Sequence, residues 1–426
     1  MKRRRFLALA GAAPLAFGRA MGAQTRGAVV AVVGGGYAGA TAARYLKLAD
    51  PGLEVVLVEP EASYVTCPLS NLVLGGFRSL ESITVGYEGL AAAGVRVVRD
   101  RALEVDARSR RVRLARGDPI AFDRAIVAAG VDFMWDELPA LKDAAARDAV
   151  PHAWKAGPQT AILRRQLEAM PDGGTFVISI PEAPFRCPPG PYERACQAAA
   201  YFKAAKRRSR VLVLDANGDV LSKGALFKRA WKELYDGIVE YRPDSKAIDV
   251  DVASRTVKLD FGDVKGDVLN VIPPMKAGDA AAPFITANGR WCEVDWLTYE
   301  SKAAAGVHVL GDSLQIAPLM PKSATMANAQ AKACAAAVAM LLAGRAPNPA
   351  PVLVNACYSW LSPTEVAHVA SVHRYDPTDR TMKPVPGAGG LSPARSRAEA
   401  PGALAWERAI RADAWAASAS GGPALA

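Results

Sequence analysis

The sequence predicts an α/β fold made of two dinucleotide-binding-type units and a C-terminal α+β domain. Three observations support this prediction. A strand, a glycine-rich turn and a helix can be traced through residues 28–48, and a strand-turn-helix outline with a proline-rich turn recurs in residues 174–206. A later strand near residue 308 and the Ala-rich helix after it have the spacing of a segment that returns to the first unit.

The chain of 426 residues is long enough for two or three domains. We expect residues 26–139 and 276–345 to form the first unit, and residues 140–275 to form the second. Residues 346–426 are expected to form the C-terminal domain, with a loop at 386–402 and then a short helix that has too little apolar surface to anchor in a membrane.

The first 23 residues have the pattern of an export signal. The segment "MKRRRFLALAGAAPLAF" joins a basic start to a short apolar stretch, and the small residues of "RAMGAQ" follow, as cleavage requires. Arg3 and Arg4 resemble the twin-arginine pattern of proteins that are exported after folding. The alternative is a frayed basic N-terminus. We therefore expect a periplasmic protein exported by the twin-arginine route.

Composition argues against several other classes of protein. The formal net charge is +10, but five positive charges lie in residues 1–23, and the remainder is too scattered to indicate nucleic-acid binding. No apolar run reaches the roughly 18 residues of a membrane span, so no stable membrane insertion is expected. Four scattered histidines, and six cysteines without a Cys-x-x-Cys pair, predict neither a zinc site nor a haem attached to this chain.

The first unit carries a complete nucleotide fingerprint. In "AVVAVVGGGYAGATAARYLKL", Gly34, Gly36 and Gly39 form G-x-G-x-x-G between a strand and a helix, and Glu59 ends the next strand 20 residues later. The first glycine allows the tight turn, the second lets backbone approach a pyrophosphate, and the third lets helix and strand pack closely. The helix N-terminus offers amides to the phosphates, and the acid binds a ribose hydroxyl.

Two later motifs favour FAD over NAD as the dinucleotide. The strand in "FDRAIVAAGVD" ends at Ala129 and Gly130, which resembles the A-T-G motif of flavoproteins with two dinucleotide-binding domains, the glutathione reductase-like fold. In "GVHVLGDS", Asp312 follows a buried strand, where such flavoproteins hold the ribityl chain. The N-terminus of the next helix is expected to face the flavin ring. A simple turn role for Asp312 is the alternative.

The second unit lacks a nicotinamide fingerprint. After the strand "GTFVISI", the turn "PEAPFRCPPGPYERA" contains five prolines, and Gly190 is its only glycine. Proline has no N–H to offer a phosphate, and its ring blocks close approach. We therefore expect a strand-turn-helix outline that has lost the NAD(P)H site, which disfavours an NADH-linked reductase.

Four segments together resemble the flavin subunit of flavocytochrome c sulfide dehydrogenase: "YVTCPLSN", "PFRCPPGPYERA", "GDS…PLMPKSA" and "NACYSWL". They occur in the same order and with similar spacing along nearly the whole chain. The resemblance implies that Cys67 bonds covalently to the 8α position of FAD and that Cys187 and Cys357 form a redox disulfide. It also implies that Glu193 is the acid/base near the sulfur site and that Lys322 is among the cofactor-binding residues.

The residues themselves agree with parts of this assignment. Cys67 lies eight residues beyond Glu59, and an extended segment of that length reaches roughly 26 Å, far enough to run beside FAD towards its ring. Pro68 favours an extended conformation at Cys67. A buried structural thiol at Cys67 and an ordinary structural disulfide between the other two are the alternatives. Three further cysteines are read as structural: Cys196 and Cys334 in Ala-rich helices, and Cys292.

The resemblance implies periplasmic oxidation of hydrogen sulfide to sulfane sulfur or polysulfide, with electrons passed to a c-type cytochrome. Because this chain has no haem-binding motif, haem c must lie on a separate partner subunit. Two alternatives remain at this point. One is a sulfide:quinone oxidoreductase, and the other is a non-catalytic electron-transfer or partner-activating flavoprotein of a sulfur-oxidation system.

Overall fold

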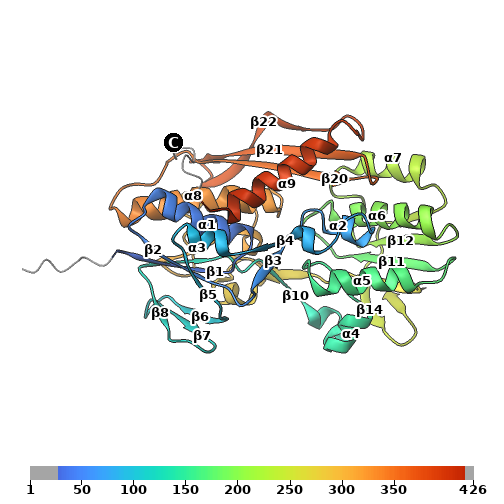
Figure 1. Cartoon of the computed structure of the whole chain (residues 1–426), viewed down its shortest axis with the longest axis horizontal. Coiled ribbons are helices and arrows are strands. Elements are labelled where there is room, and N and C mark those ends of the chain that lie inside the picture. The colour runs from blue at the N-terminus through green and yellow to red at the C-terminus, as the bar shows by residue number, and fades with distance from the viewer. Residues whose placement is uncertain (1–26, 418–426) are drawn as a thin grey trace, which may run out of the picture.

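The structure is a computed structural model that describes residues 27–417. The first unit is built on a five-stranded parallel sheet whose central strand is wholly apolar and buried, as expected of a sheet covered on both faces. From one edge to the other the strands are β19 (Val307–Val309), β9 (Arg124–Val127), β1 (Val29–Val33), β2 (Glu54–Val58) and β5 (Arg96–Val98). Figure 1 shows this sheet in one half of an elongated molecule.

Two helices pack together over one face of this sheet, α1 (Tyr37–Ala49) and α8 (Ala324–Leu342). Both are rich in buried alanines, which allow the helix axes to come close. A small sheet is attached at the other side of the unit, made of β6 (Ala102–Asp106), β7 (Arg111–Leu114) and β8 (Ile120–Ala121). Between β2 and β5 lie β3 (Ser63–Val65), α2 (Ser70–Leu74), β4 (Thr84–Gly86) and α3 (Glu88–Ala92).

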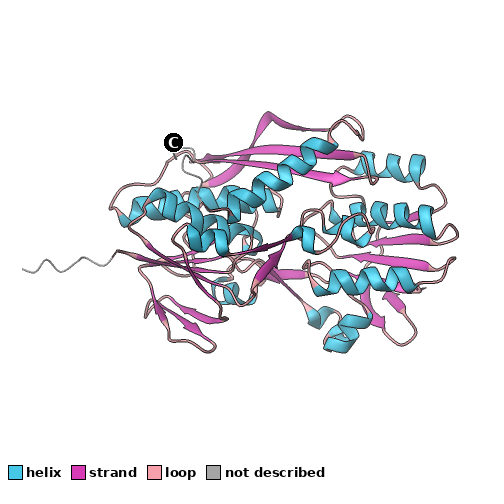
Figure 2. Ribbon diagram, in the orientation of Figure 1, coloured by secondary structure: helices cyan, strands magenta, loops and turns pink. Residues whose placement is uncertain are grey.

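The second unit has a parallel sheet of four strands, and Figure 2 shows its helices stacked beside the strands. In sheet order the strands are β13 (Val239–Arg242), β12 (Arg210–Asp215), β11 (Thr175–Ile180) and β17 (Val268–Val271). Its helices are α4 (Ala144–Ala149), α5 (Pro158–Ala169), α6 (Gly190–Ala205) and α7 (Gly224–Leu234). An antiparallel sheet follows, with β14 (Ala247–Asp251), β15 (Thr256–Leu259) and β16 (Gly262–Lys265). The strands β10 (Val131–Phe133) and β18 (Met275–Ala277) pair where the chain passes between the units.

The C-terminal part is an antiparallel sheet with one helix, and it crosses both units (Figure 1). Its elements are β20 (Val352–Trp360), β21 (Val366–Asp376), β22 (Thr381–Leu391) and α9 (Ala400–Trp415). The expectation of a loop from residue 386 is wrong in its first part, because residues 386–391 belong to β22. The glycines and prolines that suggested a loop are tolerated because β22 is an edge strand with a register shift opposite Ser371 and His373.

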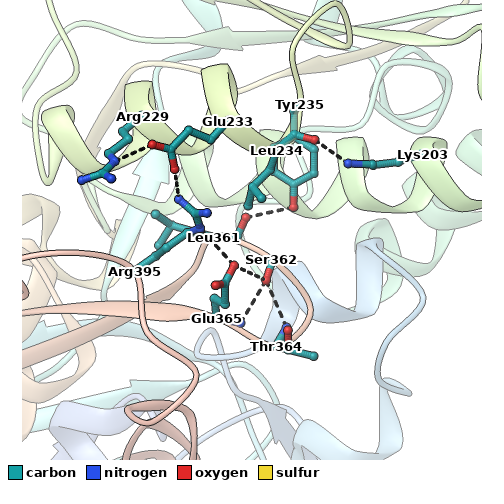
Figure 3. Close-up of polar contacts among 10 residues, drawn as sticks. All are labelled: Lys203, Arg229, Glu233, Leu234, Tyr235, Leu361, Ser362, Thr364, Glu365 and Arg395. Carbon is teal, nitrogen blue, oxygen red and sulfur yellow. Dashed lines mark hydrogen bonds and ion pairs between the residues drawn. The ribbon is translucent and has the colours of Figure 1, made fainter.

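Polar contacts attach the β20–β21 turn to the second unit, as Figure 3 shows. The Tyr235 hydroxyl, just beyond α7, donates to the Leu361 carbonyl at 2.9 Å. Arg395 bridges Glu233 of α7 and Glu365 of the turn, with 3.0 Å between its Nε and the Glu365 carboxylate. These contacts fix the end of β20, the strand that carries Cys357, against α7.

Candidate active site

The first unit contains an elongated cavity of about 690 Å³ at the carboxyl ends of its parallel strands, which we call the dinucleotide cavity. This size and position are typical of a cofactor site in an open α/β sheet. The predicted residues that line it are Gly34, Gly36, Glu59, Cys67, Ala129, Gly130 and Asp312. Gly39 and Lys322, also predicted, do not line it.

The glycine turn shows why an extended cofactor fits here. Gly34 has φ +98°, and a Cβ on it would lie 2.5 Å from the Ala128 carbonyl oxygen. Gly39 sits behind the turn, where a Cβ would lie 1.8 Å from the Gly34 carbonyl oxygen. The glycine turn before α1 therefore approaches the cavity with bare backbone, and its last residue, the N-cap Gly36, has no side chain to cap the helix. The amides of the first turn are left for phosphate oxygens.

Replacing Gly39 with alanine should lower both flavin content and stability. The new methyl group would collide with the Gly34 carbonyl and push the helix away from the turn, a kind of overpacking that costs about 1–3 kcal/mol. Gly390→Ala is the matched control, because no atom lies within 4 Å of the added Cβ there. The flavin-to-protein ratio and the thermal midpoint of the purified proteins provide the measurement. Normal values of both for Gly39→Ala would contradict the assignment of this turn.

Glu59 occupies the position expected of a ribose-binding acid at the end of β2. Its carboxylate accepts hydrogen bonds from the backbone N–H groups of Gly35 (2.7 Å) and Glu61 (3.0 Å). Burial raises the pKa of Glu59, and these two hydrogen bonds act in the opposite direction. The carboxylate is thereby held at the wall of the dinucleotide cavity, within reach of a ribose hydroxyl.

The turn after β19 faces the same cavity from the other side. Ser313 donates to the Gly130 carbonyl at 2.6 Å, which ties this turn to the Ala129-Gly130 motif. Lys322 lies behind the turn, where its ammonium donates to the Asp312 carbonyl at 2.8 Å and rests 3.6 Å from the centre of the Trp291 ring. Burial lowers the pKa of Lys322 to about 7. In the structure Lys322 supports the Asp312 turn and does not line the cavity, and its role as a cofactor-binding residue stays a prediction.

A second, smaller cavity of about 60 Å³ adjoins the first, and we call it the thiol cavity. Cys67, Cys187 and Cys357 all line it, although they come from the β3–α2 loop, the β11–α6 loop and strand β20. Cys67 lines the dinucleotide cavity as well, so it lies where the two cavities meet. Burial raises the pKa of the Cys67 thiol to about 11, against the effect of the nearby Arg186 guanidinium.

All three cysteines are free thiols in the structure, so the Cys187–Cys357 disulfide is not formed in it and stays a prediction. Cys187 has an unusual left-handed backbone with φ +58°, and its N–H donates to the Lys322 carbonyl at 2.9 Å. Cys357 lies within the nine-residue strand β20. Burial raises the pKa of both thiols.

Glu193, in the first turn of α6, also lines the thiol cavity. Its carboxylate accepts from the Trp360 N–H at 2.6 Å and from the Asn71 amide at 2.8 Å. Burial raises the pKa of Glu193 despite these bonds. The upward direction of this shift is the one that the predicted acid/base role requires.

Several residues of the site were missed by sequence reasoning. Arg186 lines both cavities, and its only sequence signal is its place directly before Cys187. Arg194 is buried beside the thiol cavity, where it donates to the Asn71 side chain (3.1 Å) and to Asn270 (2.7 Å). Because Asn71 in turn holds Glu193, Arg194 positions that carboxyl indirectly. Both arginines lie within the quoted segment "PFRCPPGPYERA", but an arginine there has no local signal that separates a site residue from a solvated one.

The other three cysteines lie away from both cavities. Cys196 and Cys334 are fully buried in α6 and α8, as small core residues. Cys292 is also fully buried, and its thiol lies 3.5 Å from the Ala281 carbonyl. None of the three lines the dinucleotide or the thiol cavity.

In the second unit, the position of a ribose-binding acid is already used within the protein. Asp215 ends β12, and its carboxylate accepts the hydroxyls of Tyr192 (2.7 Å) and Tyr241 (3.0 Å) and the Asn217 amide (2.7 Å). A carboxylate with three side-chain donors has little capacity left for a nucleotide. This arrangement supports the expectation that the unit keeps the outline of a nucleotide domain without its NAD(P)H site.

The fold and the two cavities define a two-domain FAD-dependent α/β oxidoreductase. Residues 28–153 match the family model for pyridine nucleotide-disulphide oxidoreductases. The chain is similar to the solved sulfide:quinone oxidoreductase of Aquifex aeolicus, with a TM-score of 0.72 at 16% identity, covering 92% of this chain and 93% of that one. It is also similar to the structure of the covalent putidaredoxin reductase–putidaredoxin complex, with a TM-score of 0.61 at 15% identity, covering 90% and 93%.

Two further family models are more specific. Residues 160–273 match the central domain of the sulfide dehydrogenase [flavocytochrome c] flavoprotein chain, and residues 349–415 match the flavin-binding domain of flavocytochrome c sulphide dehydrogenase. A 44-residue stretch is 57% identical to the flavoprotein chain of that enzyme from Chlorobaculum thiosulfatiphilum, covering 10% of this chain and 92% of the other. The chain belongs to the family of flavocytochrome c sulfide dehydrogenase flavoprotein chains.

A more distant likeness links the chain to eukaryotic proteins. Over 305 residues it is 23% identical to the mitochondrial sulfide:quinone oxidoreductase of Mus musculus, covering 66% of this chain and 65% of the mouse protein. The chain thus spans a little under two thirds of the length of this relative, and 56% of the length of the Dictyostelium discoideum protein of the same name. Among the helices in residues 27–417, none is long and apolar enough to cross a membrane.

Proposed function

We propose that this chain oxidises sulfide to sulfane sulfur, using bound FAD and a redox pair formed by Cys187 and Cys357. The observation that carries the proposal is the junction of the two cavities. Three cysteines from separate segments meet in the thiol cavity, and one of them, Cys67, also borders the dinucleotide cavity. Thiols placed so close to a flavin site are suited to transfer electrons to it.

The size of the thiol cavity favours a small substrate. Its volume of about 60 Å³ has room for roughly four water-sized groups. A sulfide ion or a short sulfur chain meets this limit. The Arg186 guanidinium at the boundary of the two cavities, and Arg194 at the thiol cavity, provide positive charge for an anionic substrate.

In the proposed reaction, HS⁻ attacks one sulfur of the Cys187–Cys357 disulfide. The S–S bond breaks, so one cysteine becomes a persulfide and the other a thiolate. A second HS⁻ removes the outer sulfur as HS₂⁻ and leaves the pair as one thiol and one thiolate. Closing the disulfide again releases one proton and two electrons, and the Glu193 carboxylate lies at the cavity to accept the proton. The sum is oxidation of two HS⁻ to HS₂⁻ and H⁺ with two electrons.

The residues of the dinucleotide cavity fit FAD. The bare amides at Gly36 would hold its pyrophosphate, Glu59 a ribose, and Asp312 its ribityl chain, with Cys67 proposed as the covalent attachment point. When bound, FAD supplies a two-electron acceptor that can be reoxidised in single-electron steps. A c-type cytochrome subunit, as the family's name implies, is the proposed electron acceptor and the carrier of haem c.

We further propose that the reaction takes place in the periplasm after twin-arginine export. Arg3 and Arg4, on which this proposal rests, lie outside the described residues. Attachment of FAD before export would suit that location, since a cofactor lost outside the cytoplasm is not easily replaced.

With sulfide as donor, the flavin-loaded protein is expected to reduce cytochrome c faster than a soluble quinone. Steady-state absorbance assays with the two acceptors under the same conditions provide the comparison, and protein without flavin serves as the blank. A faster reaction with the quinone would favour the sulfide:quinone oxidoreductase alternative, which the likeness to the mouse and Aquifex proteins keeps in view. If sulfide does not reduce the flavin, whichever acceptor is present, the proposed function is wrong and a non-catalytic role remains.

A further inference from the structure

A buried lysine outside both cavities has no role in the chemistry described above. The side chain of Lys223 is almost fully buried, with 6% of its surface exposed, and its ammonium donates to the Ser359 hydroxyl at 3.0 Å. Among the residues described by the structure, no carboxylate forms an ion pair with it. Burying an ammonium with one neutral partner is costly, and an apolar side chain would fill the same space without that cost.

The backbone of Lys223 adds to this cost. It is the N-cap of α7 and has φ +59°, a left-handed conformation that a glycine would adopt more easily. Its carbonyl accepts the N–H groups of Leu226 and Phe227, which begin the helix. The turn could therefore form with a smaller residue, and the long charged side chain requires a separate explanation.

Strand geometry connects the Lys223 ammonium to the thiol cavity. Side chains two residues apart on a strand lie on the same face, about 7 Å from each other, so Ser359 and Cys357 share a face of β20. The next residue, Trp360, donates its N–H to Glu193 at 2.6 Å. Lys223 thus contacts β20 between Cys357 and Trp360, the residue that binds Glu193. It lies at the start of α7, whereas Tyr235 and the Glu233–Arg395–Glu365 bridge connect the end of that helix to the β20–β21 turn (Figure 3).

We propose that Lys223 is a positioning residue of this site, which holds β20 through Ser359 and supplies the positive charge that allows Cys357 to become a thiolate when the Cys187–Cys357 pair is open. The inference rests on the proposed function for its meaning in turnover. The charged and titratable groups that line the thiol cavity with Cys357 are Cys67, Arg186, Cys187, Glu193, Arg194 and Tyr358, and Lys223 reaches the same strand through Ser359. Lys223 offsets the negative charge of Glu193.

The electrostatic effects agree with this assignment in direction. Burial raises the pKa of Cys357, Lys223 lowers it, and Glu193 raises it. The ammonium likewise lowers the pKa of Glu193, which burial raises. Removing the lysine charge should therefore move the pKa of Cys357 upward, so that less thiolate is present at neutral pH.

The test measures how fast iodoacetamide alkylates Cys357 at a series of pH values, in reduced, flavin-loaded protein, with the modified peptide quantified by mass spectrometry. In Lys223→Met the midpoint of the pH profile should rise by about one unit, which means roughly tenfold less alkylation at neutral pH. Lys223→Arg keeps the charge and should restore a profile close to that of the wild type. Lys228→Met is the matched control, because Lys228 lies on the same helix with 48% of its side chain exposed and pairs with Asp219.

An unchanged Cys357 profile in folded Lys223→Met overturns the inference, and so does an equal shift in Lys228→Met. If Lys223→Met does not fold, Lys223→Gln provides the same test with the same two outcomes. A merely structural role would lower the thermal midpoint without moving the pH profile. Because the measurement uses neither sulfide nor an acceptor, its failure is distinguishable from a failure of the proposed function, which the acceptor assay decides.

Discussion

Replacing Cys187 or Cys357 with serine is expected to slow the reduction of bound FAD by sulfide by roughly a thousandfold, or about 4 kcal/mol of activation free energy. The physical reason is the loss of the electrophile. A serine hydroxyl cannot form the disulfide that HS⁻ attacks. The thiol cavity would still have room for a small anion, but the S–S bond that must break would be missing. Stopped-flow bleaching of the flavin absorbance after mixing with sulfide measures the rate.

The control for this experiment is Cys334→Ala, which removes a thiol that is fully buried in α8 and lines neither cavity. It should lower stability by about 1 kcal/mol and leave the bleaching rate per flavin unchanged. A purely structural Cys187–Cys357 bridge would give the reverse result for the serine variants, with lower stability and near wild-type bleaching. That outcome in both variants would eliminate the redox-disulfide mechanism and leave the family assignment intact.

Cys67→Ser is expected to change FAD from a covalent to a dissociable cofactor. In the wild type, acid denaturation should leave the yellow colour with the precipitated protein, and the polypeptide mass should include one FAD. In the variant the colour should pass entirely into the supernatant, because no other cysteine lines the dinucleotide cavity. Intact mass spectrometry and the absorbance of the supernatant give the two measurements.

Cys196→Ala is the matched variant for this prediction, since Cys196 is a fully buried thiol of α6 outside both cavities. It should retain covalent FAD. Release of all flavin from the wild type on denaturation, together with a polypeptide of unmodified mass, would show that Cys67 is not the attachment point. The cavity geometry would then describe a noncovalent site with a thiol beside it.

Local features of the fold were predictable because their signals are local. The spacing of Gly34, Gly36 and Gly39 follows from the backbone of one turn, and the structure places Glu59 beside that turn by the pairing of β1 with β2. The same kind of signal failed at residues 386–391. Glycine and proline indicate a loop when read alone, but pairing with β21 makes this segment an edge strand.

The same distinction between local signals and tertiary contacts applies to the site residues. Motifs along the sequence identified Cys67, Cys187 and Cys357 as a group, through resemblance to a family, and they placed Lys322 among the cofactor-binding residues. The structure puts Lys322 behind the Asp312 turn, because its ammonium is held by the Asp312 carbonyl and the Trp291 ring. Arg194, although it lies in the quoted segment "PFRCPPGPYERA", and Lys223, at the N-cap of α7, were missed because a single basic residue has no local signal that separates a buried one from a solvated one.

The sequence by itself determined the order of the elements in the first dinucleotide-binding unit, the absence of a glycine fingerprint from the second unit, and the family. Each of these depends on residues that are close together in the chain or on motifs in a set order. Only the tertiary structure decided which side chains share a cavity. Cys187 and Cys357 are 170 residues apart, and their meeting depends on β20 lying against α7 and α8. Contacts of that kind follow from the packing of whole elements, and no spacing along the chain encodes them.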